Sequence, residues 1–160
     1  MFMNAESLRI ADQLRRAFIG DPWHGSPLVD LLAGITSEKV RARPLPLLHS
    51  IWELVLHIDF WLHAALDATE GVAMPKLDGG ASEWPALGDD SEAAWIAARN
   101  RLFENGGRLA AAIEDFDDAK LQDTVPGRQY DFYYLFHGIV QHSLYHGGQI
   151  AMLKKALSAG

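Results

Sequence analysis

The sequence predicts an all-α fold, a four-helix bundle with long crossover connections. Four long stretches carry apolar residues at three- and four-residue steps, which is the pattern of amphipathic helices. The segments 71–90 and 115–128 that separate them contain Pro and Gly clusters and show no periodicity. Links of this length favour crossovers over the short hairpins of a simple up-and-down bundle. At 160 residues the chain is expected to form a single domain.

The composition excludes several classes of function. A net charge of −7 without a Lys/Arg stripe argues against nucleic-acid and anionic-membrane partners, because both need a positive surface. No apolar run approaches the roughly 20 residues of a membrane span, and the N-terminal stretch lacks the pattern of a signal peptide. We therefore expect a cytoplasmic protein. The absence of cysteine excludes disulfides and thiolate ligands, so any metal must be held by His, Asp or Glu.

The first predicted helix covers Ala5–Phe18 and ends at Gly20 and Pro22. The loop that follows, GDPWHGSP, carries Trp23 and His24. Trp23 could cover one end of the bundle, or it could line the mouth of a pocket together with His24, since constrained loops often carry function.

Two short helices are expected next, at Ser26–Ala33 and around Ser37–Val40. The second is ended by Pro44 and Pro46.

The second long helix is expected to begin near His49 or Ser50 and to end at Gly71. Ser50 and Glu53 have the spacing of a capping box. Glu53 also lies one turn before His57, so its carboxylate could instead be a partner of a metal ligand or a base. These two interpretations of Glu53 have equal support from the sequence.

The third long helix is expected from the Ser91 cap to about Glu114, with Gly106-Gly107 weakening or kinking its middle. The fourth should run from about Asp131 to Leu157. Between the second and third helices, segment 71–90 is interpreted as a lid, a crossover or local disorder, with Trp84-Pro85 packing onto the bundle.

His142 and His146 on the last helix are candidate metal ligands. Residues four apart project from one helix face, offset by roughly 40°, and such a histidine pair can bind one divalent ion. The third ligand is expected to be His57, on the second long helix. A lone buried histidine is more often a satisfied core residue, but two on one inward stripe favour a shared metal. Gln149 faces the same way and could contact substrate or a water on the metal.

Three segments carry a resemblance to a known family: WHGSP, HSIWELVLHIDFW and QHSLYHGGQIAMLKK. Together they resemble the DinB-like (DNA-damage-inducible) family of four-helix-bundle metalloproteins, over about residues 5–157. The most specific motif is H-x-x-x-H-x-G-Q-I, at residues 142–150. The resemblance implies metal binding by His57, His142 and His146, and a homodimer. Some members are transferases or isomerases that use bacillithiol, mycothiol or glutathione.

Two functions are therefore expected. In the first, the protein is an enzyme whose metal, zinc or nickel, activates water or a low-molecular-weight thiol for hydrolysis or S-transfer on a small molecule. Glu53 and His24 are the candidates for proton transfer, and the pocket candidates are Trp23, Trp61, Tyr145 and Gln149. In the second, the protein is a non-catalytic metal or small-molecule binding module that acts as a dimer. A fourth protein ligand closing the metal site would favour this second function.

Overall fold

The chain folds as a helical bundle in a computed structural model, which describes residues 5–76 and 83–158. Four helices are long: α1 (Ala5–Ile19), α4 (Ile51–Thr69), α5 (Glu92–Glu114) and α6 (Phe132–Ser158). Three are short: α2 (Leu28–Leu31), α3 (Ser37–Arg41) and the 3₁₀ helix η1 (Asp118–Lys120). Among the described residues there is no strand, only an isolated bridge between Thr124 and Asp131. The all-α prediction is confirmed.

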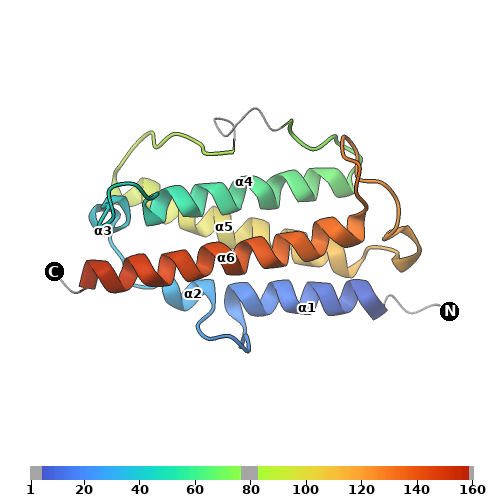
Figure 1. Ribbon diagram of the computed structural model, residues 1–160, viewed down its shortest axis with the longest axis horizontal. Helices are drawn as coiled ribbons and strands as arrows, with labels where there is room; N and C mark the ends of the chain where they lie inside the picture. The colour runs from blue at the N-terminus through green and yellow to red at the C-terminus, as the bar shows by residue number, and fades with distance from the viewer. Residues whose placement is uncertain (1–4, 77–82, 159–160) are drawn as a thin grey trace.

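The four long helices form a ring in which each packs on two others. α1 contacts α5 and α6, and α4 contacts the same two helices from the other side. Figure 1 shows that α4 and α5 both begin at the end of the bundle where α3 lies. The connection between them therefore returns over the length of the bundle, as expected of a crossover. The link between α5 and α6 stays at the opposite end. None of the described helices is long and apolar enough to cross a membrane.

The helix starts follow the capping residues in the sequence. Ser50 caps α4: its hydroxyl accepts from the N–H of Glu53 at 3.3 Å, and its own N–H donates to the Glu53 carboxylate at 2.7 Å. The predicted capping box is therefore present. Ser91 caps α5 by accepting from the N–H of Ala94 at 3.2 Å. Because such side chains satisfy backbone donors that a helix leaves free, they fix where each helix begins.

The apolar stripes of the four long helices meet in one core. Its largest fully buried side chains on these four helices are Ile10, Leu14, Ile51, Ile58, Leu62, Trp95, Leu102, Leu109, Ile113, Phe136 and Ile150. One carboxylate, Asp59 on α4, is buried with them and accepts hydrogen bonds from Arg101 and Asn105 of α5, both at 2.8 Å. Burying a carboxylate is costly unless it is paired, so these bonds stabilise the α4–α5 interface.

Gly106 in the middle of α5 permits close contact with α1. α5 continues without interruption through Gly106 and Gly107. A Cβ atom at Gly106 would lie 2.8 Å from Cδ1 of the Phe18 ring, whereas one at Gly107 would meet open space. The glycine pair lowers the helix propensity of α5. At Gly106 the missing side chain also lets the Phe18 ring pack against the helix backbone.

This difference gives a matched pair of substitutions. Gly106→Ala should lower the free energy of unfolding by up to about 2 kcal/mol, because an overpacking cost of about 1–3 kcal/mol exceeds the gain of about 1 kcal/mol in helix propensity. Gly107→Ala should raise it by up to about 1 kcal/mol. Urea denaturation of both variants measures the difference. Equal stabilisation by the two alanines would contradict the close contact with Phe18.

Candidate metal centre

Three histidine side chains converge where α4 packs against α6. Nε2 of His142 lies 3.0 Å from Nε2 of His57 and 3.1 Å from Nε2 of His146. His57 and His146 are 5% and 6% exposed, and His142 is half-buried. Within residues 5–76 and 83–158 this is the one group of three or more His, Asp or Glu side chains whose ligand atoms lie together, all within 4.8 Å of one another.

The helices explain why the rings meet. His142 and His146 are one turn apart on α6, and their ring centroids are 4.4 Å apart. His57 reaches the same point from α4, because α4 and α6 are neighbours in the ring of helices. The structure thus brings together the three residues that the sequence predicts as ligands.

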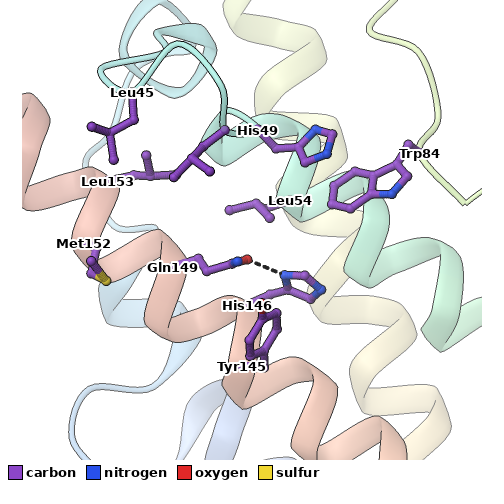
Figure 2. Close-up of a pocket in the computed structure, with 10 residues that line it drawn as sticks. Leu45, His49, Leu54, Trp84, Tyr145, His146, Gln149, Met152 and Leu153 are labelled. Carbon is purple, nitrogen blue, oxygen red and sulfur yellow. Dashed lines mark hydrogen bonds between the residues drawn. The ribbon is translucent and has the colours of Figure 1, made fainter. Parts of the chain in front are cut away.

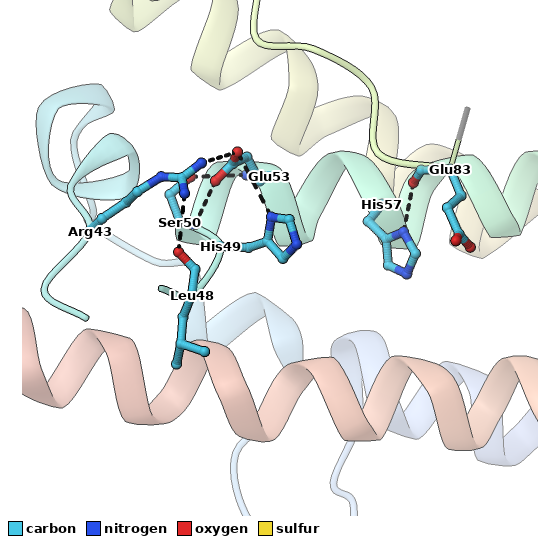
Figure 3. Close-up of polar contacts among 7 residues, drawn as sticks. All are labelled: Arg43, Leu48, His49, Ser50, Glu53, His57 and Glu83. Carbon is cyan, nitrogen blue, oxygen red and sulfur yellow. Dashed lines mark hydrogen bonds and ion pairs between the residues drawn. The ribbon is translucent and has the colours of Figure 1, made fainter. Parts of the chain in front are cut away.

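Hydrogen bonds at Nδ1 orient two of the three imidazoles. Nδ1–H of His57 donates to the backbone carbonyl of Glu83 at 2.6 Å (Figure 3). Nδ1–H of His146 donates to Oε1 of Gln149, also at 2.6 Å (Figure 2). Because each Nδ1 carries the proton, each Nε2 keeps its lone pair and faces the other two rings. Such outer partners typically fix the tautomer of metal-binding histidines.

Trp84, in the connection between α4 and α5, covers one side of the histidine cluster. Its ring stacks on His57 with centroids 3.8 Å apart and planes 5° apart, and on His49 at 3.6 Å and 6°. Trp61 lies edge-on to His57 and His142, at 6.5 and 6.4 Å. Two consecutive residues therefore hold the His57 ring: Glu83 through its carbonyl and Trp84 through its side chain.

Burial keeps the three histidines neutral. It lowers the pKa of His57 and of His146 below the ordinary imidazole value of 6.5. The pKa of His142 falls to about 3, first through burial and then through the nearby His146 and His57. Three neutral imidazoles with their Nε2 atoms directed at one another fit a divalent ion that prefers imidazole, such as zinc or nickel.

A cavity of about 300 Å³ opens beside His146 (Figure 2). Trp84 and His49 contribute to its wall from one side, and Tyr145 and Gln149 contribute from α6. The cavity therefore adjoins the histidine cluster through His146.

The other predicted site residues have varied positions. Tyr145 and Gln149 line this cavity, and Trp61 contacts the histidine rings. Trp23 and His24 are exposed and line a separate cavity with Gln13, Arg16, Ala17, Pro22 and Leu144. The structure does not bring these two residues to the three histidines.

The Glu53 carboxylate is directed toward the start of α4 (Figure 3). It accepts from the N–H of Ser50 and forms an ion pair with Arg43, and His49 Nδ1 lies 3.9 Å away. These contacts support the capping interpretation. A role of Glu53 or His24 in proton transfer stays a prediction.

The sequence did not indicate the roles of Glu83, Trp84 and His49. Trp84 was expected only to pack onto the bundle, and His49 only to lie near the start of the second long helix. The backbone carbonyl of Glu83 leaves no trace in a sequence, because every residue has one. Only the Trp-Pro pair within a loop gave a signal that this segment packs down.

A family model described as the DinB superfamily matches residues 23–150. The chain belongs to the DinB superfamily. The matched residues include His57, His142 and His146, so the family assignment and the histidine cluster concern the same part of this DinB protein. The resemblance identified from the sequence is confirmed. No curated protein and no solved structure matches the chain.

The stability of the metal-free protein should depend on pH. The unfolded chain takes up protons on its histidines as pH falls through about 6.5, whereas the buried histidines resist protonation until lower pH. The free energy of unfolding of chelator-treated protein should therefore decrease from pH 7 to pH 5. This window lies above the range in which carboxylates titrate. Denaturation at each pH measures the slope, and His142→Asn should flatten it. If His142→Asn has the same pH slope as the unsubstituted protein, His142 is not one of the histidines that resist protonation.

Gln149 should contribute to metal affinity without being a ligand. Gln149→Leu leaves Nδ1–H of His146 without its acceptor, so zinc affinity should fall by about 10–100-fold. Competition with a chromogenic chelator measures this change. Gln141→Leu, an exposed position on the same helix, is the matched control and should leave the affinity unchanged. Equal affinities of the two variants would show that the Gln149 contact does not support the site.

Proposed function

We propose that the protein is a metal-dependent enzyme that acts on a small molecule at the three-histidine centre. The observation that carries this proposal is the convergence of three neutral imidazole nitrogens beside a cavity. No fourth His, Asp or Glu ligand atom joins them within the described part of the chain. Three protein ligands with a position left for another molecule are typical of catalytic metal sites, whereas structural sites usually have four.

Each residue of the centre has a distinct role in this proposal. His57, His142 and His146 would hold the ion. The ion would act as a Lewis acid and lower the pKa of a thiol or water bound to it. The carbonyl of Glu83 and the amide of Gln149 orient two of the rings. The aromatic rings of Trp61 and Trp84 surround the histidines and exclude bulk water, which strengthens electrostatic interactions within the centre.

The nucleophile comes from outside the protein. The chain contains no cysteine, so a thiol has to arrive as a cosubstrate, and a hydrolytic reaction would use water. The proposal therefore covers two reaction types, S-transfer or isomerisation with a low-molecular-weight thiol, and hydrolysis. Zinc and nickel both suit three imidazole ligands. The homodimer implied by the family resemblance and the cytoplasmic location stay predictions.

A screen of metal-loaded protein tests the proposal. Bacillithiol, mycothiol and glutathione are each supplied with chlorodinitrobenzene or maleylpyruvate, while ester and amide hydrolysis are measured in parallel. Turnover should disappear in His146→Ala with the helical fold retained, because one of three ligands is lost. His63→Ala, an exposed position on α4, is the control and should keep full activity. Saturable dependence on a thiol would select S-transfer over hydrolysis.

The opposite result also has a clear meaning. If every assay is silent while metal is fully bound, the enzyme proposal is wrong. The alternative, a non-catalytic metal or small-molecule binding module, then accounts for the same histidine cluster.

A further inference from the structure

We infer that the cavity beside His146 is a subsite for the uncharged, apolar tail of the substrate, whose polar reacting group lies at the three histidines. This inference rests on the proposed function and names its substrate class.

The wall of the cavity is largely apolar. Five of its ten lining residues are aliphatic or thioether side chains: Leu45, Leu48, Leu54, Met152 and Leu153. The rings of Trp84 and Tyr145 add aromatic surface. Ligand sites of this kind, apolar with a few placed polar groups, bind molecules that bury apolar surface.

The apolar wall continues to the protein surface. Leu54 and Leu153 are buried at 3% exposure, whereas Tyr145 and Met152 are 65% and 68% exposed. Leu45 and Leu48 are also exposed. Apolar side chains that gather around one opening, rather than singly, indicate a surface that another apolar group covers. An apolar tail that enters the cavity would cover both the buried and the exposed apolar side chains of the wall and remove them from water.

The described part of the cavity wall carries no permanent charge. Among the described residues that line the cavity, none is Lys, Arg, Asp or Glu. Arg43, near the start of α4, is occupied by its ion pair with Glu53 and by the carbonyl of Leu48 (Figure 3). An anionic tail would therefore lose its hydration without gaining a cationic partner.

The cavity has a polar and an apolar end. In Figure 2, His146 and Trp84 lie toward one side, whereas Leu45, Met152 and Leu153 gather at the other. Seven residues of helix separate His146 from Leu153, which is a rise of about 10 Å. A substrate with its reacting group at the histidines would thus extend its tail along α6 toward the C-terminal end of that helix.

A series of hydroxamic acids tests the inference by binding alone. Zinc-loaded protein is titrated in a calorimeter with acetohydroxamic acid, octanohydroxamic acid and suberic acid monohydroxamate, which share a metal-binding head. Octanohydroxamic acid should bind more tightly than acetohydroxamic acid, by about fourfold for each methylene that is buried. The monohydroxamate, whose tail ends in a carboxylate, should bind at least about tenfold more weakly than octanohydroxamic acid.

A charge placed in the wall should change this preference. Met152→Lys offers a partner to the terminal carboxylate, so the preference for the uncharged tail should shrink by up to about fivefold. Affinity for acetohydroxamic acid should not change, because its head lies at the histidines. Tyr134→Lys is the matched control: it is 65% exposed on the same helix, outside the cavity lining, and should leave all three affinities unaltered.

The outcomes separate the two proposals. If acetohydroxamic acid binds but the longer tail adds no affinity, or if the carboxylate tail binds as well as the methyl tail, the apolar subsite is wrong and the open metal centre stands. If none of the three compounds binds zinc-loaded protein, the ion has no accessible position. That result overturns the proposed function and the subsite together.

Discussion

The packing of α4 against α6 is the contact on which the rest of the site depends. It places three buried imidazole groups so that their Nε2 atoms face one another, 3.0 and 3.1 Å apart for two of the pairs. Such an arrangement costs free energy, because polar nitrogen atoms leave water and few hydrogen-bond partners replace it. The Nδ1 hydrogen bonds to Glu83 and Gln149 and the stacked Trp84 offset part of this cost. A shared cation would offset the remainder.

Helix α4 separates two polar sites within the core. His57 faces α6, whereas Asp59, two residues later and about 200° around the axis, faces α5. There Asp59 is satisfied by Arg101 and Asn105 from the same chain. The two sites thus differ. Asp59 has hydrogen-bond partners from its own chain, whereas Nε2 of His57 and Nε2 of His146 are lone-pair acceptors that face the other histidines. This contrast distinguishes a structural polar contact from a group arranged to bind something.

Much of the fold, and the pairing of two of the three clustered histidines, could be predicted from the sequence, because both depend on local spacing. Helical periodicity located the four long helices to within a few residues, and the spacing of Ser50 and Glu53 gave the cap. The four-residue step of His142 and His146 predicted that both rings lie on one face of the last helix, and their ring centroids are 4.4 Å apart. The contributions of Glu83 and Trp84 could not be predicted, since the conformation of an aperiodic connection is set by tertiary contacts. The same holds for Arg43, which decides where the Glu53 carboxylate points, and for Phe18 against Gly106. Residues 77–82 of the predicted crossover lie outside the described part of the chain.

The positions of the ligands along the chain also bear on how the protein matures. His57 and His142 are 85 residues apart, and His146 follows one turn later. During synthesis a growing chain contains only one of these three histidines until its last helix emerges from the ribosome. Because domains generally fold as units, tight capture of an ion at this cluster would have to wait for α6 to dock against α4. Occupancy of the centre would then report that the C-terminal helix has been made and correctly placed. A chain cut short before that helix could compete only weakly for the cell's metal.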